Sequence, residues 1–273
     1  PLDEFIKLPT TVDFNLLYTD RIQLYLSTRP YLKIGEIFAN GYVVVYTNRS
    51  NIPQVFEELG NDFFGFFPII MSPLDRASNE ASGISPTLER PDLSLSGQGV
   101  IIGFVDTGID YTKDAFRYED GSTKILEIWD QAVDGDRTVS PARTSQVYFG
   151  SIYSQEKINE ALASPIPLTV VPTMDEDGHG TFLASAAAGS PNGDLTGAAP
   201  RANIVAVKLR RANSYYIERY LLSPENPNLF ESTDFLLGLK YIADLSEELN
   251  MPVVFCVGMG SNLGGHDGNT YLE

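Results

Sequence analysis

The chain has 273 residues and a formal net charge of −17, and 43% of its residues are hydrophobic. This is enough apolar material for one sizeable core, or for one core with a small extra domain. The negative charge argues against nucleic acid and anionic membrane as partners, because both surfaces would repel the protein. No window of the sequence approaches the roughly 18 to 20 uncharged apolar residues that a membrane-spanning helix needs.

Cys256 is the only cysteine, so the chain cannot form an internal disulfide. It lies within an apolar run, where a cysteine usually acts as a small buried hydrophobic residue rather than a nucleophile. The sequence begins at Pro1 without a basic segment followed by an apolar one, so it shows no signal peptide. The absence of an initiator Met leaves room for residues before Pro1.

The first region, residues 1–90, is expected to form a small α+β unit. Apolar spacing and strand-forming residues indicate its elements, and residues 72–98, rich in Ser, Pro, Gly and charge, indicate a linker. The elements expected are a helix over residues 13–26, a strand over residues 42–46, and a short helix that begins at its cap Asn51 and stops at Gly60.

The sequence changes character near residue 99. Three apolar runs do not alternate with polar residues, which is typical of parallel strands buried on both faces. In chain order the expected elements are a strand at 100–105, a helix at 180–188, a strand at 204–209, a helix at 234–249 and a strand at 253–257. This alternation predicts an α/β fold for residues 91–273, an open parallel sheet with helices on both faces.

Asp106 follows the first of these strands directly, in the sequence Asp-Thr-Gly. Catalytic groups gather at the carboxyl ends of strands in open α/β sheets, so this position suits a functional carboxylate. It stays ionised there only if neighbours donate hydrogen bonds, and Thr107 and the amides of the turn are suitable donors. An aspartate that merely caps the turn is the alternative. Aspartic peptidases share the tripeptide but need a second copy, which this chain lacks.

His179 lies in Asp-Gly-His-Gly-Thr, at the start of the expected helix over residues 180–188. Glycines on both sides of the histidine permit a close backbone approach. The positive end of the helix dipole disfavours the imidazolium form, which keeps the ring neutral, as a general base must be. The alternative is a histidine that only begins the helix.

Asp-Thr-Gly followed by His-Gly-Thr, in this chain order, resembles the subtilases, the family of subtilisin-like serine endopeptidases with an α/β fold. Residues 197–208 resemble the family segment that leads into the strand after the histidine helix. More narrowly, residues 116–131 and 265–268 resemble the clostridial branch, which includes the Csp germination proteases and related gut-bacterial peptidases. The resemblance covers residues 97–273.

The resemblance implies roles for these motifs. Asp106 orients and supports His179, and His179 takes the proton from a serine nucleophile. It also implies that the substrate pairs as an added strand with the backbone of Gly258, Met259 and Gly260. Where the family commonly has Asn, Ser and Leu in this segment, the chain has Cys, Gly and Met, so specificity is not inferred.

The family's oxyanion-hole asparagine and its serine, in a Gly-Thr-Ser-like motif, are expected downstream of residue 273. No Gly-x-Ser-x-Gly occurs in the sequence, and nothing ties Ser185 to an oxyanion hole. We therefore expect the N-terminal part of a longer peptidase, with a complementary C-terminal part as its partner; a complete 273-residue protein is the alternative. Residues 1–90 are then expected to be a propeptide that chaperones folding and inhibits the site, or else a generic accessory domain.

Acidic clusters raise the question of a metal. Those within residues 110–120 and 134–136 lack the regular spacing of a calcium loop. Residues 175–177 lie close to His179, but His266 is the only other histidine and no His-Glu-x-x-His occurs, so a zinc peptidase is not expected. We expect no metal and no cofactor.

The sequence thus predicts a bacterial serine endopeptidase, secreted or spore-associated, that acts on peptide or protein substrates. The alternative is a catalytically inert pseudoprotease with a subtilase fold that binds or regulates partners. Retention of both Asp106 and His179 favours activity, because an inert relative has no chemical need for either. Residues 210–231 resemble an insertion that either borders the substrate cleft or forms a surface loop.

Overall fold

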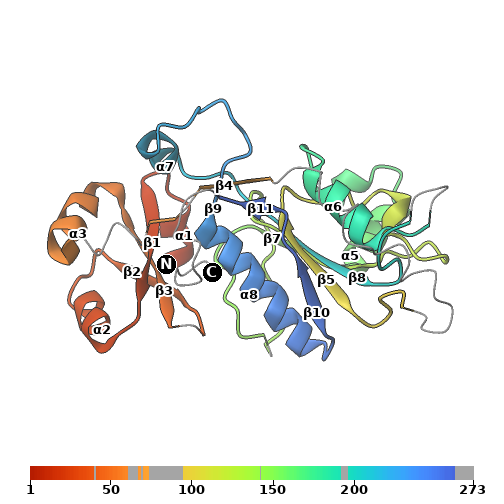
Figure 1. The fold of residues 1–273 in the computed structure, drawn as a ribbon, viewed down its shortest axis with the longest axis horizontal. Helices are drawn as coiled ribbons and strands as arrows, with labels where there is room; N and C mark the ends of the chain where they lie inside the picture. Colours follow the sequence, from red (N-terminus) through yellow and green to blue (C-terminus); the bar gives the residue numbers. More distant parts are fainter. Residues whose placement is uncertain are drawn as a thin grey trace.

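The computed structural model describes residues 1–39, 41–60, 67–68, 70–73, 95–141, 143–191 and 196–261. They form an N-terminal unit and a larger unit built on a five-stranded sheet, with helix α8 (Ser232–Glu248) between the two (Figure 1). The expected likeness at residues 265–268 lies outside the described residues. Within the described ranges, no helix is long and apolar enough to cross a membrane.

The large sheet confirms the α/β expectation. Its strands lie in the order β10-β5-β8-β6-β7, and all neighbours are parallel except β7, which is antiparallel to β6. Three strands were expected from their apolar runs, whereas β6 and β7 were not. The bounds are β5 Ile101–Asp106, β6 Ile125–Asp130, β7 Ser151–Ser154, β8 Asn203–Lys208 and β10 Val253–Cys256.

Helices cover both faces of this sheet. On one face α6 (His179–Ala188) packs its small residues Ala184 and Ala188 against Phe104, and α5 (Gln155–Ala163) joins the same apolar cluster. On the other face α8 packs against strand residues such as Val105. Alternate residues of β5 therefore enter two different cores, which is why its apolar run is continuous. The described residues also include the 3₁₀ turns η1 Arg49–Asn51, η3 Asp114–Phe116 and η4 Pro167–Thr169.

The N-terminal unit is a three-stranded antiparallel sheet with short helices. Its strand order is β1-β3-β2, and β3 (Tyr42–Asn48) lies in the middle. The short helix expected from Asn51 to Gly60 is confirmed as α3, and Gly60 has a positive φ of 69° at its end. The other bounds are α1 Leu2–Ile6, β1 Thr11–Leu17, α2 Asp20–Ser27, β2 Lys33–Ile37 and α3 Ile52–Leu59.

The helix expected over residues 13–26 is wrong. Residues up to Leu17 form strand β1, and α2 begins only at Asp20, capped by the side chain of Thr19. In β1 the polar residues Asp13 and Asn15 are buried like their apolar neighbours, because both faces of the strand are covered. Because polar and apolar residues are mixed along this segment, its apolar residues have a spacing that resembles that of a helix.

Strand β3 joins the two units. Val43 and Val45 face the helices of the N-terminal unit, whereas Val44 and Tyr46 share a cluster with Phe235 of α8 and other residues of the large unit. The period of two along a strand sends alternate side chains to opposite faces. The N-terminal unit is therefore packed onto α8 through an apolar face.

A third, small sheet lies where the two units meet. Strand β4 (Ile70–Pro73) is its middle strand, between β9 (Phe230–Glu231) and β11 (Met259–Gly260), and both neighbours are antiparallel to it. Figure 1 shows β4 passing across the end of the large sheet. The linker expected over residues 72–98 is thus wrong for Ser72 and Pro73, and residues 74–94 lie outside the described residues.

Residues 210–231 are neither a bare loop nor separate from the core. They contain α7 (Ser214–Arg219), whose Tyr216 and Ile217 pack into the core of the N-terminal unit. The Tyr216 hydroxyl donates a hydrogen bond to the backbone oxygen of Asp13. The segment then returns as β9 beside β4, so it holds the N-terminal unit at one end and borders the small sheet at the other.

Candidate active site

The structure brings Asp106 and His179 together. Nδ1 of His179 lies 2.7 Å from Oδ1 of Asp106. The aspartate ends β5 and its side chain is only 2% exposed, whereas the histidine begins α6 and remains 16% exposed. An ionised carboxylate only accepts hydrogen bonds, so Nδ1 carries the proton and Nε2 presents a lone pair.

Hydrogen bonds from its own turn hold the Asp106 carboxylate. The Thr107 amide donates to Oδ1 over 2.8 Å, and the Thr107 hydroxyl lies 3.3 Å from the same oxygen. The amide is among the donors that the sequence suggested, whereas the single proton of the Thr107 hydroxyl is directed to Asp175, 2.8 Å away. Within the described part of the chain, the other oxygen, Oδ2, is buried and has no hydrogen-bond partner.

Glycine lets the two motifs touch. A β-carbon on Gly180 would lie 2.2 Å from the backbone oxygen of Gly108 and 3.1 Å from Asp106 Oδ1. No larger residue fits there unless the backbone moves, because real β-carbons do not approach other atoms so closely. The close approach of the loop after β5 to the start of α6 is what places His179 beside Asp106.

The segment expected to pair with substrate lies next to this site. A β-carbon on Gly258 would lie 3.0 Å from His179 Cε1 and 3.1 Å from Asp106 Oδ2. Met259 and Gly260 form β11, which pairs with Pro73 and Ser72 of β4. The predicted edge therefore lies beside the His–Asp pair, and backbone of the chain's own N-terminal part is paired with it.

The sequence analysis did not predict the strand on the other side of β4. Strand β9 pairs with the other end of β4, Ile70 with Glu231 and Met71 with Phe230. Two-residue strands leave no periodicity to recognise, so no sequence signal pointed to β9. Asp175 was considered only as a metal ligand, but it accepts hydrogen bonds from both catalytic motifs, as described below.

Cys256 lies at the end of β10, next to the site. Burial, and then the charge of Asp106, raise the pKa of its thiol above the ordinary value. A raised pKa lowers the thiolate fraction at neutral pH, which is unlike an activated nucleophile. The sequence predicts a small buried residue here, whereas the structure leaves Cys256 only partly buried.

No metal centre emerges from the acidic clusters. Within the described ranges, no three His, Cys, Asp or Glu side chains are grouped so that they can hold an ion. Asp110, Asp120 and Asp136 instead accept hydrogen bonds from the amides two residues later. This is the local turn geometry that aspartate commonly stabilises.

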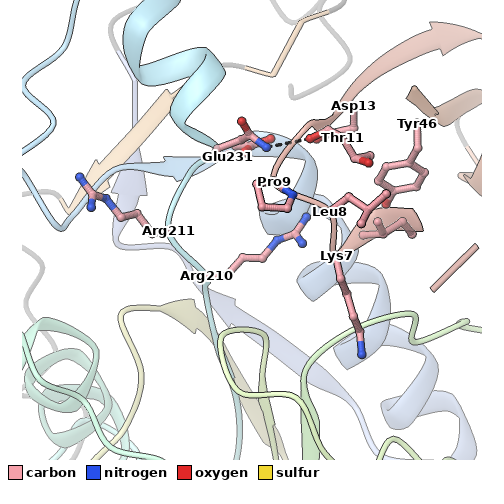
Figure 2. Close-up of a pocket in the computed structure, with 11 residues that line it drawn as sticks. Lys7, Leu8, Pro9, Thr11, Asp13, Tyr46, Arg210, Arg211 and Glu231 are labelled. Carbon is pink, nitrogen blue, oxygen red and sulfur yellow. Dashed lines mark hydrogen bonds between the residues drawn. The ribbon is translucent and has the colours of Figure 1, made fainter. Parts of the chain in front are cut away.

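A second buried polar cluster lies between the two units, around a cavity of about 150 Å³ (Figure 2). Asp13 and Tyr46 come from the N-terminal unit, and Arg210 and Glu231 from the large unit. Arg210 donates two hydrogen bonds to Asp234, at 2.7 and 3.1 Å. In the described residues, Asp13 Oδ2 and Glu231 Oε2 are buried without partners.

The electrostatics of this cluster follow from a surplus of carboxyls. Burial raises the pKa of Asp13, and it raises the pKa of Glu231 well above its ordinary value, with added repulsion between the two groups. Arg210 opposes both effects but is already paired with Asp234. Each of the two carboxyls therefore favours its protonated form more than an exposed carboxyl does.

The comparisons agree with the geometry. Residues 97–221 match the family model described as the subtilase family. This segment is therefore similar to subtilases. The solved structure of the Clostridium perfringens CspB protease is 34% identical and covers 71% of this chain and 36% of its own, with a TM-score of 0.56. The similarity thus extends beyond the matched segment to the fold.

Two curated plant subtilases are also similar. Subtilisin-like protease SBT3.1 of Arabidopsis thaliana is 33% identical over 126 residues, which are 41% of this chain and 16% of that protein. Subtilisin-like protease SBT2.2 of the same plant is 32% identical over 128 residues, 41% of this chain and 15% of its own length. The chain therefore spans less than a fifth of either plant subtilase.

Proposed function

We propose that this chain supplies the aspartate and the histidine of a serine endopeptidase site, and that both act on a serine outside the chain. The observation that carries the proposal is the 2.7 Å contact between Nδ1 of His179 and Oδ1 of Asp106, within the segment similar to subtilases. The pairing of β4 with both β9 and β11, next to this pair, supports it.

The chemistry follows from the hydrogen-bonding pattern. His179 Nε2 removes the proton of the serine hydroxyl as the serine oxygen attacks the scissile carbonyl carbon. The imidazolium that forms is stabilised by Asp106 and gives its proton to the leaving amine as the C–N bond breaks. Water, deprotonated in turn by Nε2, then hydrolyses the acyl-enzyme and releases the acid.

The substrate binds as an extended strand between β9 and β11. Backbone pairing of this kind gives affinity without demanding particular side chains. In the register of β4, one substrate residue lies opposite Met259 and the next lies opposite Gly258, beside His179. Because Gly258 has no side chain, it leaves room for His179 beside the substrate backbone.

In the same proposal the N-terminal unit is a propeptide that covers the site. Strand β4 has the place and the pairing that a substrate strand needs, and its attachment to the N-terminal unit keeps it there. Incubation of the full-length polypeptide followed by N-terminal sequencing is expected to give a new start between residues 74 and 95. An active enzyme that keeps its original N-terminus would instead indicate an accessory domain.

The peptidase proposal is tested by a fluorophosphonate probe, which phosphorylates an activated serine. The full-length polypeptide that carries this sequence is expected to be labelled on one serine, and tandem mass spectrometry identifies it. His179→Ala is expected to abolish the labelling while the protein stays folded. A folded wild-type protein with its N-terminal unit removed that takes no label would support the pseudoprotease.

A further inference from the structure

The threonines of the two motifs exchange hydrogen bonds across the site. The amide of Gly180 donates to Oγ1 of Thr107 over 3.0 Å, and the amide of Asp110 donates to Oγ1 of Thr181 over 2.9 Å. Each threonine therefore binds the backbone of the other motif. The two bonds tie the loop after β5 to the first turn of α6.

Asp175 accepts hydrogen bonds from both of these hydroxyls. Thr107 donates to Oδ1 over 2.8 Å and Thr181 donates to Oδ2 over 2.6 Å. The amides of Gly178 and Thr181 complete the set at 2.9 and 2.8 Å. Because a carboxylate only accepts, it turns both hydroxyl protons toward itself and leaves a lone pair on each threonine oxygen for the amide of the other motif.

The Asp175 carboxylate is well held. Only 8% of the residue is exposed, and burial by itself raises the pKa of the carboxyl. The hydrogen bonds from Thr181, Gly178 and Thr107 outweigh burial, so the pKa lies below its ordinary value. The group is therefore charged near neutral pH, and a charged acceptor makes stronger hydrogen bonds than a neutral one.

We propose that Asp175 is a positioning residue for catalysis, which holds Asp106 and His179 at hydrogen-bonding distance by orienting Thr107 and Thr181. Its contacts reach the residue after the aspartate and the residues on both sides of the histidine. This inference rests on the proposed function, and it adds a residue that acts through others rather than on the substrate.

A matched control separates positioning from plain stabilisation. Asp130, at the end of β6, is also a buried aspartate and accepts from the amides of Ala132 and Val133 and the hydroxyl of Thr173. Its three hydrogen bonds come from residues outside both the Asp-Thr-Gly and the His-Gly-Thr motifs. Asp130→Asn therefore disturbs a similar hydrogen-bonded turn without touching the catalytic pair.

The first readout needs no turnover. In the full-length polypeptide labelled with ¹⁵N-histidine, the Nδ1–H resonance of His179 reports its hydrogen bond to Asp106. It is identified as the resonance that is lost in His179→Ala, and His266 is the other histidine of the present sequence. Asp175→Asn is expected to shift or broaden this resonance, and Asp130→Asn to leave it in place. Thr107→Val is expected to act like Asp175→Asn, whereas Thr107→Ser, which keeps the hydroxyl, retains the wild-type signal.

The second readout is the kinetics of the full-length enzyme. Asp175→Asn is expected to lower kcat roughly tenfold to a hundredfold, the cost of a small misplacement of catalytic groups, with KM changed by less than about twofold. An unchanged Nδ1–H resonance in Asp175→Asn, or equal losses of kcat in Asp175→Asn and Asp130→Asn, would overturn the proposal. If the wild-type enzyme hydrolyses nothing, the proposed function fails, and the resonance alone decides the role of Asp175.

Discussion

The two buried carboxylate clusters of this chain differ in how many donors surround them. At the His–Asp site, Asp175 accepts four hydrogen bonds, and Asp106 accepts from its own turn and from His179. Between the two units, Asp234 takes both bonds of Arg210, while Asp13 and Glu231 each keep a buried oxygen without a partner in the described residues. Both clusters join segments distant in sequence. Asp106 also keeps a buried oxygen, Oδ2, without a partner in the described residues, but each carboxylate of the first cluster accepts at least two hydrogen bonds.

The difference teaches what each cluster is suited to do. A carboxylate with enough donors stays charged and holds a fixed geometry, as catalysis requires. Buried carboxyls without donors hold a proton instead, so the contact that they make depends on pH. On the proposed function, the first cluster holds Asp106 and His179 in a fixed geometry. The raised pKa values of Asp13 and Glu231 make the contact between the N-terminal unit and the large unit depend on pH.

The largest expected effect comes from replacing the hydrogen-bond acceptor beside His179 with a donor. Asp106→Asn places an amide beside His179 Nδ1 and favours the tautomer in which Nε2 carries the proton. We expect kcat to fall by roughly 10⁴-fold, because Nε2 is then no longer a base. Steady-state peptide hydrolysis measures it, and a loss of less than about tenfold would contradict the assigned role.

The next effect tests the close approach of the two motifs. Gly180→Ala puts a β-carbon 2.2 Å from the Gly108 oxygen, so the start of α6 must move. We expect kcat to fall about a hundredfold. Gly178→Ala is the control, because Gly178 has a positive φ of 88° but open space around its β-carbon position. It should cost stability without a comparable loss of kcat; similar losses in both variants would count against the close-approach account.

A smaller effect tests whether strand β4 covers the proposed site. Met71→Pro removes an amide from the middle strand of the small sheet, where proline fits poorly. We expect the N-terminal unit to cover the site less well, so the initial rate of fluorophosphonate labelling rises severalfold. Met71→Ala keeps the amide and should label at the wild-type rate. An unchanged rate in the proline variant would mean that β4 does not obstruct the site.

The smallest expected effect tests the second cluster. The folded-state pKa values of Asp13 and Glu231 are raised, so the folded protein keeps a proton that the unfolded chain releases above its ordinary values of 3.8 and 4.5. Stability therefore falls as pH rises through and above this range. Glu231→Gln imitates the protonated side chain and keeps the oxygen that accepts from the Asn213 amide over 2.6 Å.

We expect Glu231→Gln to be more stable than the wild type at pH 7 to 8, by on the order of 1 kcal/mol, since the variant does not have to take up a proton when it folds. At pH 4 the two proteins should differ little. Thermal unfolding across this pH range measures the difference, with the exposed Glu247→Gln as the control. A variant that is less stable than the wild type at pH 8 would mean that Glu231 is ionised and well paired.

Much of the region around Asp106 and His179 could be predicted from the sequence because its signals are local. The continuous apolar run before Asp106 and the small residues after His179 are each recognisable within a short segment, and the turn donor Thr107 is adjacent to the carboxylate it serves. The parallel strands on either side of Asp106 then follow from the α/β alternation, and the structure confirms this fold.

What could not be predicted depends on contacts distant in sequence. Strand β1 was mistaken for a helix because tertiary burial of Asp13 and Asn15 overrides their polar character. Strand β9 is two residues long and exists only because β4 lies beside it. Asp175 looked like one acid among three, since its role requires Thr107, 68 positions earlier in the chain, to be its neighbour.

The most direct test of the account is a pre-steady-state burst with a p-nitrophenyl ester, using the full-length polypeptide after removal of the N-terminal unit. A serine activated by His179 acylates faster than it deacylates, so we predict a burst of one p-nitrophenolate per protein molecule, followed by slow turnover. The burst should vanish in His179→Ala. A burst of equal size in that variant, or none in the folded wild-type enzyme, would contradict the claim that Asp106 and His179 serve a catalytic serine.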